Sequence, residues 1–205
     1  MDKQGASQFH LSKSLFRAYD IRGIVGHTLN SEIAFKIGKA FADLSKQLDI
    51  TQVCIAYDAR LSSPELYESF CEGLHLQGIE VIQLGLAPVS LPYFYMSSND
   101  KVSAVMVTGS HNPPNYNGFK LFIEGASLTS DQLNNLYKIV LKSDFKKSKN
   151  GSIKKIEITS KYLEKIKQKI KLDCSFKVVI DGGNGAAGAD PCVPAPLGAM
   201  APAHR

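Results

Sequence analysis

The 205-residue chain is 44% hydrophobic and 21% charged, carries a net charge of +5 and has four cysteines. This composition excludes a wholly disordered chain, and cysteines without any CxxC pair indicate neither a zinc knuckle nor a disulfide framework. No apolar run is long enough to span a bilayer and residues 1–20 lack an apolar signal core, so we expect a cytoplasmic protein without a membrane partner.

The positive charge is concentrated in residues 142–177, where twelve lysines accompany four acidic residues. This excess of eight positive charges leaves the rest of the chain at about −3. The segment lacks the interleaved aromatic residues and arginines that proteins use to stack on bases or to read them. We therefore expect a solvated linker and helix face, and the alternative of a nucleic-acid site is the weaker one.

Apolar periodicity predicts alternating helices and strands after a flexible, polar leader at residues 1–14. Helices are predicted at 31–48, 63–78, 91–98 and 130–142, and strands at 52–57, 79–85, 101–108 and 119–124. Asn30 or Ser31 is a suitable cap for the first helix, Ser63 with Pro64 for the second, and Thr129 with Gln132 forms a capping box for the fourth.

This alternation predicts an α/β fold in which helices sandwich a mixed, mostly parallel sheet. Ligands of such sheets gather at the carboxyl ends of the strands. Polar loops follow three of the predicted strands, at 58–63, 85–89 and 108–118. We expect these loops to meet at one rim of the sheet, within a first domain that covers residues 15–150.

Residues 151–188 resemble the opening of a second domain of the same class. They contain a short strand at 153–158, a basic amphipathic helix at 160–171 and a strand at 177–181 that leads into GGNGAAG. Residues 189–205 differ in character, because they hold four of the nine prolines and no lysine. We expect a truncation or a shifted reading frame after about residue 188, with a natural Pro/Ala-rich tail as the alternative.

The stretch TGSHNPPNYNGFK, residues 108–120, is a rigid polar loop between two apolar strands. Gly109 permits an unusual backbone angle before Ser110, and the two prolines stiffen the segment that follows. His111 and Lys120 are cationic or polar groups close to this serine in sequence. A positioned hydroxyl beside cations suits attack on phosphorus or storage of a phosphoryl group of about −2 charge. The alternative is an ordinary structured surface loop.

This loop resembles the active-site serine loop of the α-D-phosphohexomutase family, in its bacterial phosphomannomutase/phosphoglucomutase form. Three further signatures occur in the family's order, and the resemblance covers about residues 15–188. They are FRAYDIRG at 16–23, YDARLSS at 57–63 and DGGNGAAG at 181–188. Before the tail, the chain's only arginines are Arg17, Arg22 and Arg60, and all lie in these signatures, which favours a role for guanidinium groups at phosphate.

The resemblance implies that Ser110 passes a phosphoryl group to a hexose phosphate and recovers one from the resulting glucose or mannose 1,6-bisphosphate, which also serves as activator. The net reaction moves phosphate between C1 and C6. His111 would neighbour the phosphoserine, Lys120 would stabilise charge or assist proton transfer, and Arg22 would lie near the transferring phosphate. The resemblance assigns support of the substrate and the loop to Tyr19, Asp58, Arg60, Asn112 and Asn117.

The family also implies four domains, Mg²⁺ bound by three aspartates of the second domain together with the phosphoserine, and a monomer or dimer. Those later motifs do not occur here, so we expect Ser110 to be an incomplete metal site and this chain alone to have little activity.

Two other hypotheses stay open. The chain is a non-catalytic remnant or a sugar-phosphate-binding regulator, or residues 183–188 form a GxGxxG dinucleotide fingerprint, which would need a following helix and a later acidic residue.

Overall fold

The computed structural model describes residues 11–145, 148–171, 174, 177–179, 181 and 183–186. The helices are the 3-10 helix η1 (Lys13–Leu15), α1 (Ser31–Lys46), α2 (Ser63–Leu76), α3 (Ser90–Ser97), α4 (Ser130–Lys142) and α5 (Thr159–Lys169). The strands are β1 (Ile21–Ile24), β2 (Gln52–Tyr57), β3 (Glu80–Leu86), β4 (Val102–Val107), β5 (Tyr116–Ile123), β6 (Ala126–Ser127) and β7 (Ile153–Lys155).

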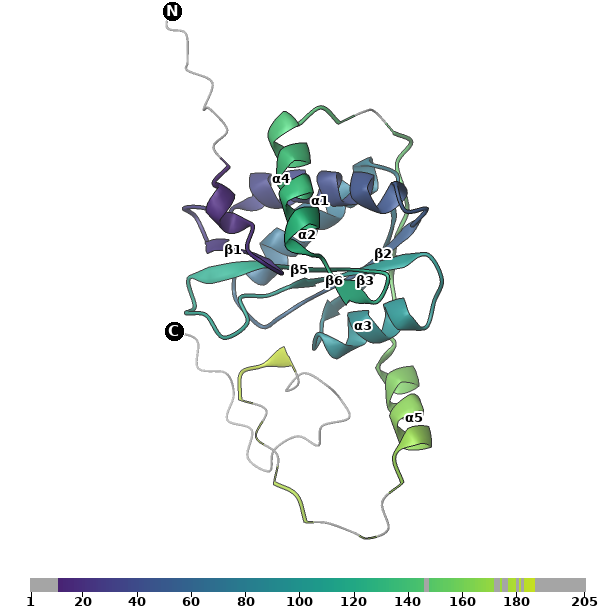
Figure 1. Cartoon of the computed structure of the whole chain (residues 1–205). Helices are drawn as coiled ribbons and strands as arrows, with labels where there is room; N and C mark the ends of the chain where they lie inside the picture. Colours follow the sequence, from purple (N-terminus) through teal and green to yellow (C-terminus); the bar gives the residue numbers. More distant parts are fainter. Residues whose placement is uncertain are drawn as a thin grey trace, which may run out of the picture.

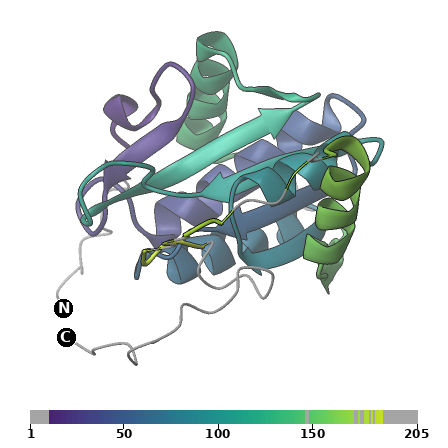
Figure 2. The ribbon, with the colours of Figure 1, turned by 90° about the horizontal axis from the view of Figure 1, so that it is seen from below.

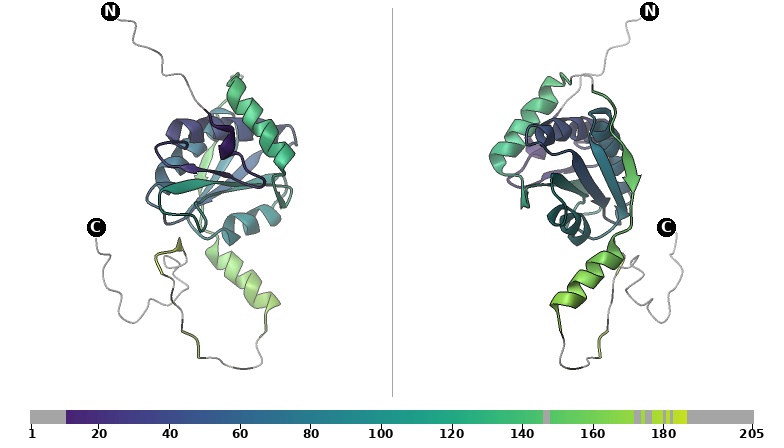
Figure 3. Two further views of the ribbon diagram at one scale, coloured as in Figure 1. Left: turned by 60° about the vertical axis from the view of Figure 1, so that its left-hand side comes forward. Right: turned by 90° about the vertical axis from the view of Figure 1, so that its right-hand side faces the viewer.

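A mixed sheet of seven strands forms the centre of the fold, in the order β1-β5-β4-β2-β3-β7 with β6 beside β5. β2 pairs in parallel with β3 and β4, and β7 pairs in parallel with β3, whereas β5 is antiparallel to β1 and β4. Helices α1, α2 and α4 cover one face and α3 covers the other (Figures 1 and 3). The structure thus confirms the predicted α/β class with a mixed sheet between helices, but the sheet is not mostly parallel, because three of its six strand pairs are antiparallel.

The central strands are buried on both faces, which explains their continuous apolar sequence. In β2, Val53 and Ile55 belong to the core under α1, α2 and α4, whereas Cys54 and Ala56 belong to the smaller core under α3. Burial raises the pKa of the Cys54 thiol far above its ordinary value, so this thiol is a packing group. The view from the α3 side shows the strands side by side across the molecule (Figure 2).

The predicted first-domain elements all form, with small shifts at their ends. α4 covers the predicted 130–142, and Thr129 and Gln132 make the complete capping box. β5 begins at Tyr116 rather than at residue 119, because Asn117 and Gly118 pair with β1. α2 has Pro64 in its first turn, but the Ser63 hydroxyl does not cap it; that hydroxyl donates to the Asp58 carboxylate instead.

The structure differs from the sequence-based expectations near both ends of the described chain. Leu11 is buried and η1 begins at Lys13, so the packed structure starts inside the segment that the sequence predicts as leader. Residues 177–179 and 181 form no strand, and the Val179 side chain is 99% exposed, because no neighbouring strand pairs with them in the described part of the chain. The tail at 189–205 lies outside the described residues.

The chain adds β7 to the edge of the sheet and then leaves the sheet. The expected strand at 153–158 is confined to Ile153–Lys155, and the expected basic helix is α5, which extends away from the sheet (Figure 3). Tyr162 of α5 packs against Phe94 of α3, with the ring centroids 5.3 Å apart. Among the described helices, none is both long and apolar enough to cross a membrane.

Candidate active site

Two of the three polar loops meet at the carboxyl ends of β2 and β4, as the sequence predicts. Residues 58–60 after β2 and the residues Ser110, Asn112 and Pro114 after β4 line one open cleft, and Asn184, Gly185 and Ala186 complete its wall. The third loop, at 85–89, does not line this cleft. These three residues of the DGGNGAAG signature therefore face the same cleft as the serine loop, although the two segments are far apart in sequence.

Ser110 presents an exposed hydroxyl from an unusual backbone conformation. Its φ is +52°, the left-handed region that costs a residue with a side chain about 1–2 kcal/mol. The hydroxyl Oγ lies 3.4 Å from Nδ1 of His111, which is also exposed. The surrounding contacts must hold this conformation, since the residue itself does not favour it.

The Arg60 guanidinium lies at the centre of the serine loop, and four backbone carbonyls accept its hydrogen bonds. Nη1 donates to the carbonyls of Pro113 at 2.7 Å and Tyr116 at 3.0 Å. Nη2 donates to those of Ser110 at 2.9 Å and Asn112 at 2.6 Å. Nε lies 3.4 Å from Oδ2 of Asp58. The four donors on Nη1 and Nη2 are thereby committed to backbone carbonyls of the loop, and Nε is in ion-pair contact with Asp58.

Gly109 has a different role from the one that its sequence suggests. Its φ lies outside the positive region, and the left-handed residue is Ser110 itself. A Cβ at Gly109 would lie 2.7 Å from Nη1 of Arg60 and closer still to the guanidinium carbon. Glycine is thus needed here because the guanidinium packs directly against the backbone.

Asp58 joins the two loops through both of its carboxylate oxygens. Oδ1 accepts hydrogen bonds from the Ser63 hydroxyl at 2.5 Å and the Arg60 backbone N–H at 3.2 Å. Oδ2 accepts hydrogen bonds from the Thr108 hydroxyl at 2.7 Å and the Gly109 backbone N–H at 3.3 Å. Asn117 is fully buried beside them and donates to the Ser62 and Ser63 hydroxyls, at 2.9 Å each.

Arg22, from β1, approaches the serine loop from its other side. Its side chain is 5% exposed; Nη1 donates to the Gly109 carbonyl at 2.9 Å, and Nη2 pairs with the Asp20 carboxylate. Lys120 Nζ lies 3.9 Å from the same carboxylate, so two cations share one anion. Nε of Arg22 is buried and has no hydrogen-bond partner among the described residues.

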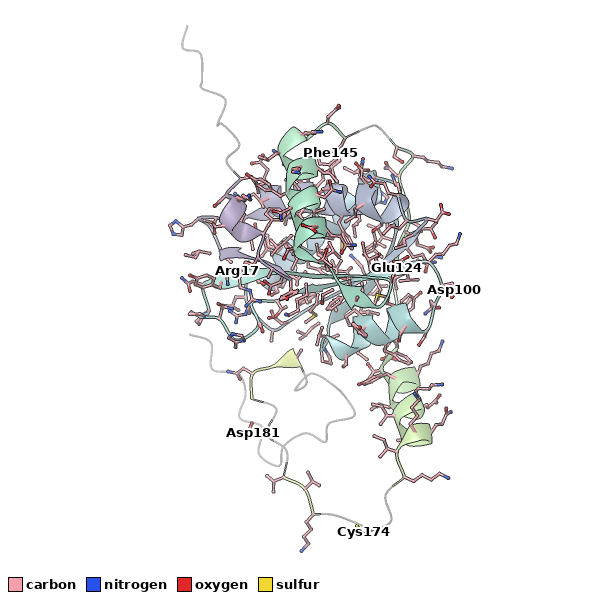
Figure 4. All side chains as sticks on the ribbon, viewed as in Figure 1. Arg17, Asp100, Glu124, Phe145, Cys174 and Asp181 are labelled. Atoms are coloured by element: carbon pink, nitrogen blue, oxygen red, sulfur yellow. The ribbon has the colours of Figure 1, made fainter. Side chains whose placement is uncertain are left out.

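Replacing Arg22 by glutamine is expected to lower the free energy of unfolding by about 2 kcal/mol, because the Asp20 carboxylate loses its guanidinium partner and the Gly109 carbonyl loses one of its donors. Urea denaturation measures the change. Arg17 provides the matched control, because it belongs to the same signature but is exposed at the outer edge beside β1 (Figure 4). Equal effects of Arg17→Gln and Arg22→Gln would contradict the assignment of these contacts to Arg22.

Of the remaining predicted residues, Asn112 belongs to the site and Tyr19 lies outside it. Asn112 lies in the loop, where its backbone N–H and its side-chain amide both donate to the Gly109 carbonyl, at 3.1 Å each. The Tyr19 side chain is 71% exposed and lies outside the cleft-lining set. Thr108, which accepts the Ser110 N–H at 2.8 Å, was not among the predicted site residues; the signal was a hydroxyl residue at the carboxyl end of a buried strand.

Magnesium fits poorly to the described residues alone. They contain no group of three or more His, Cys, Asp or Glu side chains that could hold a metal. The oxygens of Asp58 already accept hydrogen bonds from their neighbours, and Asp20 is paired with Arg22. Magnesium usually keeps several waters and takes one or two protein carboxylates, which the Ser110 hydroxyl alone does not supply.

Comparison with known proteins is consistent with this architecture. Residues 13–147 match the family model described as "Phosphoglucomutase/phosphomannomutase, alpha/beta/alpha domain I". The chain is 41% identical over 180 residues to a phosphoglucomutase of Neisseria meningitidis serogroup B, covering 87% of this chain and 39% of the relative. It is 42% identical over 178 residues to a phosphomannomutase/phosphoglucomutase of Pseudomonas syringae pv. tomato, covering 87% and 38%. The chain thus spans about two fifths of the length of these relatives.

Solved structures give the same result. A phosphoglucomutase/phosphomannomutase family protein from Burkholderia thailandensis superposes with a TM-score of 0.81 at 39% identity, over 88% of this chain and 41% of that one. A structure described as a phosphomannomutase from Thermus thermophilus, at 19% identity and a TM-score of 0.67, covers 76% of this chain and 36% of its own and supports the fold alone.

Proposed function

Because the chain belongs to the phosphoglucomutase/phosphomannomutase family, we propose that Ser110 is the phosphoryl-carrying serine of a phosphohexomutase. The reaction moves phosphate between C1 and C6 of glucose or mannose through the hexose 1,6-bisphosphate. One observation carries the proposal: an exposed hydroxyl is held in a left-handed turn by a loop whose carbonyls surround Arg60. Such preorganisation suits phosphoryl transfer, which depends mainly on positioning and on electrostatic stabilisation.

In the proposed transfer, the phosphorus of phosphoserine 110 is attacked by a free hydroxyl of the hexose monophosphate. A new bond forms between phosphorus and the sugar oxygen, and the bond between phosphorus and Ser110 Oγ breaks. The proton of the sugar hydroxyl ends on Ser110 Oγ, which becomes a hydroxyl again. The return step reverses these changes at the other phosphate of the bisphosphate. Arg22 and Lys120 supply positive charge next to the loop, and His111 is within reach of Oγ for a hydrogen bond.

We propose that a complete cycle also needs groups that the described residues do not provide. The described residues hold no cluster of three or more potential metal ligands, and we derive no step through a metal from them. The purified 205-residue chain is therefore expected to show no measurable turnover of hexose phosphates. The alternative, a non-catalytic remnant or a sugar-phosphate-binding regulator, shares the same loop and differs in whether Ser110 accepts a phosphate.

A chimera tests the proposed function. Residues 15–188 would replace the corresponding part of the P. syringae relative, which is 42% identical over this region. We expect the chimera to interconvert glucose 1-phosphate and glucose 6-phosphate within about tenfold of the parent rate, because the loop carries all the expected polar groups. A folded chimera without such activity would favour the non-catalytic alternative.

A further inference from the structure

We propose that Thr108 is a positioning residue for the phosphoryl-carrying serine, and that its hydroxyl sets the backbone conformation of Ser110. This inference rests on the proposed function for its catalytic meaning, but its structural content is independent of that function. Thr108 is 7% exposed and follows the last residue of β4. Its hydroxyl is therefore too enclosed to accept a phosphoryl group from a sugar.

The Thr108 hydroxyl has a fixed hydrogen-bond direction. Its single proton goes to Oδ2 of Asp58 at 2.7 Å, since an ionised carboxylate can only accept. A lone pair of the same oxygen then accepts the Ser110 backbone N–H at 2.8 Å. Asp58 thus orients Thr108, and Thr108 in turn holds the amide of Ser110.

The carbonyl of Ser110 is held from the opposite side. It accepts a hydrogen bond from Nη2 of Arg60 at 2.9 Å, and Nε of that guanidinium lies 3.4 Å from the same Asp58 oxygen that accepts from Thr108. These contacts close a ring from Asp58 through Thr108 and Ser110 to Arg60 and back. Both peptide groups of Ser110 are fixed, so its φ of +52° is set before any substrate binds.

The side chain of Ser110 takes no part in this ring. Its hydroxyl has one hydrogen-bond partner among the described residues, Nδ1 of His111 at 3.4 Å. A backbone that is fixed while Oγ remains exposed directs Oγ into the cleft between the two loops. Loss of the Thr108 hydroxyl would release the Ser110 amide and weaken the left-handed turn, because one side of the ring would be missing.

Thr108→Val tests the inference, since it removes the hydroxyl and keeps the shape of the side chain. Thr108→Ser restores the hydroxyl and should restore wild-type behaviour. Ser103→Ala is the matched control: Ser103 lies in β4, the strand that Thr108 follows, is fully buried, and its hydroxyl has no hydrogen-bond partner among the described residues. The readouts are hydrogen exchange at the Ser110 amide and the three-bond coupling that reports its φ, both by NMR on the 205-residue chain.

We expect Ser110 amide exchange to rise about tenfold in Thr108→Val and its positive φ to be lost or averaged, as the loss of one hydrogen bond would give. Thr108→Ser and Ser103→Ala should stay close to the wild type. An unchanged φ and unchanged exchange in Thr108→Val would overturn the inference. If Thr108→Val does not fold, Thr108→Cys takes its place, because a thiol is only a weak donor and acceptor, and an unchanged φ with unchanged exchange in that variant would likewise overturn the inference.

A kinetic readout separates this inference from the proposed function. The rate at which wild-type chain takes up phosphate from glucose 1,6-bisphosphate in the presence of Mg²⁺ is compared with that of Thr108→Val. If the wild type takes up phosphate and the variant does so about tenfold more slowly, the result supports a positioning role for Thr108. No uptake by the wild type contradicts the proposed function, and the NMR result alone then decides whether Thr108 holds Ser110.

Discussion

Replacing Ser110 by alanine in the chimera is expected to lower the rate of phosphate transfer between glucose 1-phosphate and glucose 6-phosphate more than about a thousandfold. The reason is that the variant has no oxygen to carry the phosphoryl group, and the nearby hydroxyl of Thr108 is enclosed and already bonded on both sides. A coupled assay that follows the formation of glucose 6-phosphate measures the loss.

The fold should tolerate this change. The Ser110 hydroxyl contacts His111 at 3.4 Å and supports no other described residue, so the free energy of unfolding should change by less than about 0.5 kcal/mol. Ser98→Ala is the control, because Ser98 is exposed at the end of α3, and it should keep full activity. Retention of mutase activity by a folded Ser110→Ala chimera would exclude Ser110 as the phosphoryl carrier.

Asp58→Asn is expected to lower the free energy of unfolding of the chain by about 3 kcal/mol. The Asp58 carboxylate is the acceptor in all four of its hydrogen bonds. The donors are the Ser63 and Thr108 hydroxyls and the backbone N–H groups of Arg60 and Gly109. An asparagine amide would turn an NH₂ group toward one pair of these donors, so two bonds would be replaced by a donor–donor contact. The loss of negative charge would also remove the partner of Arg60 Nε.

Urea denaturation of the 205-residue chain measures this effect, and an exposed aspartate provides the control. Asp100 lies just before β4, at the end of the sheet opposite to the serine loop (Figure 4), and Asp100→Asn should be neutral. A change below about 0.5 kcal/mol in Asp58→Asn would show that the two loops are held together by other contacts.

The fold was predictable wherever local chemistry and burial favour the same element. Helix α4 shows this well, because its capping box and its apolar stripe are both local features, and the structure has the same ends as the prediction. β1 was missed because its sequence, IRGI, is short and contains a buried arginine. Only the antiparallel pairing with β5, nearly a hundred residues later in the chain, makes this segment a strand.

The candidate site was predictable in its residue types but not in its connections. The sequence placed Ser110, Asp58 and Arg60 near one rim, because the loops after β2 and β4 share the carboxyl edge of a parallel pair. It could not show that the serine loop folds around the guanidinium, since those bonds go to backbone carbonyls, which carry no sequence signal. The close packing of Arg60 against Gly109 also became visible only in three dimensions, and Thr108 was signalled only by a hydroxyl residue at the carboxyl end of a buried strand.

The central claim is that Ser110 carries a phosphoryl group, and mass spectrometry of the chain tests it most directly. The purified 205-residue protein would be incubated with glucose 1,6-bisphosphate and Mg²⁺, and intact and peptide masses would be recorded before and after. We predict the mass of one added phosphoryl group, located on Ser110 by peptide fragmentation and absent from Ser110→Ala. A folded chain whose Ser110 stays unmodified, or whose phosphate is found on another residue, would contradict the account.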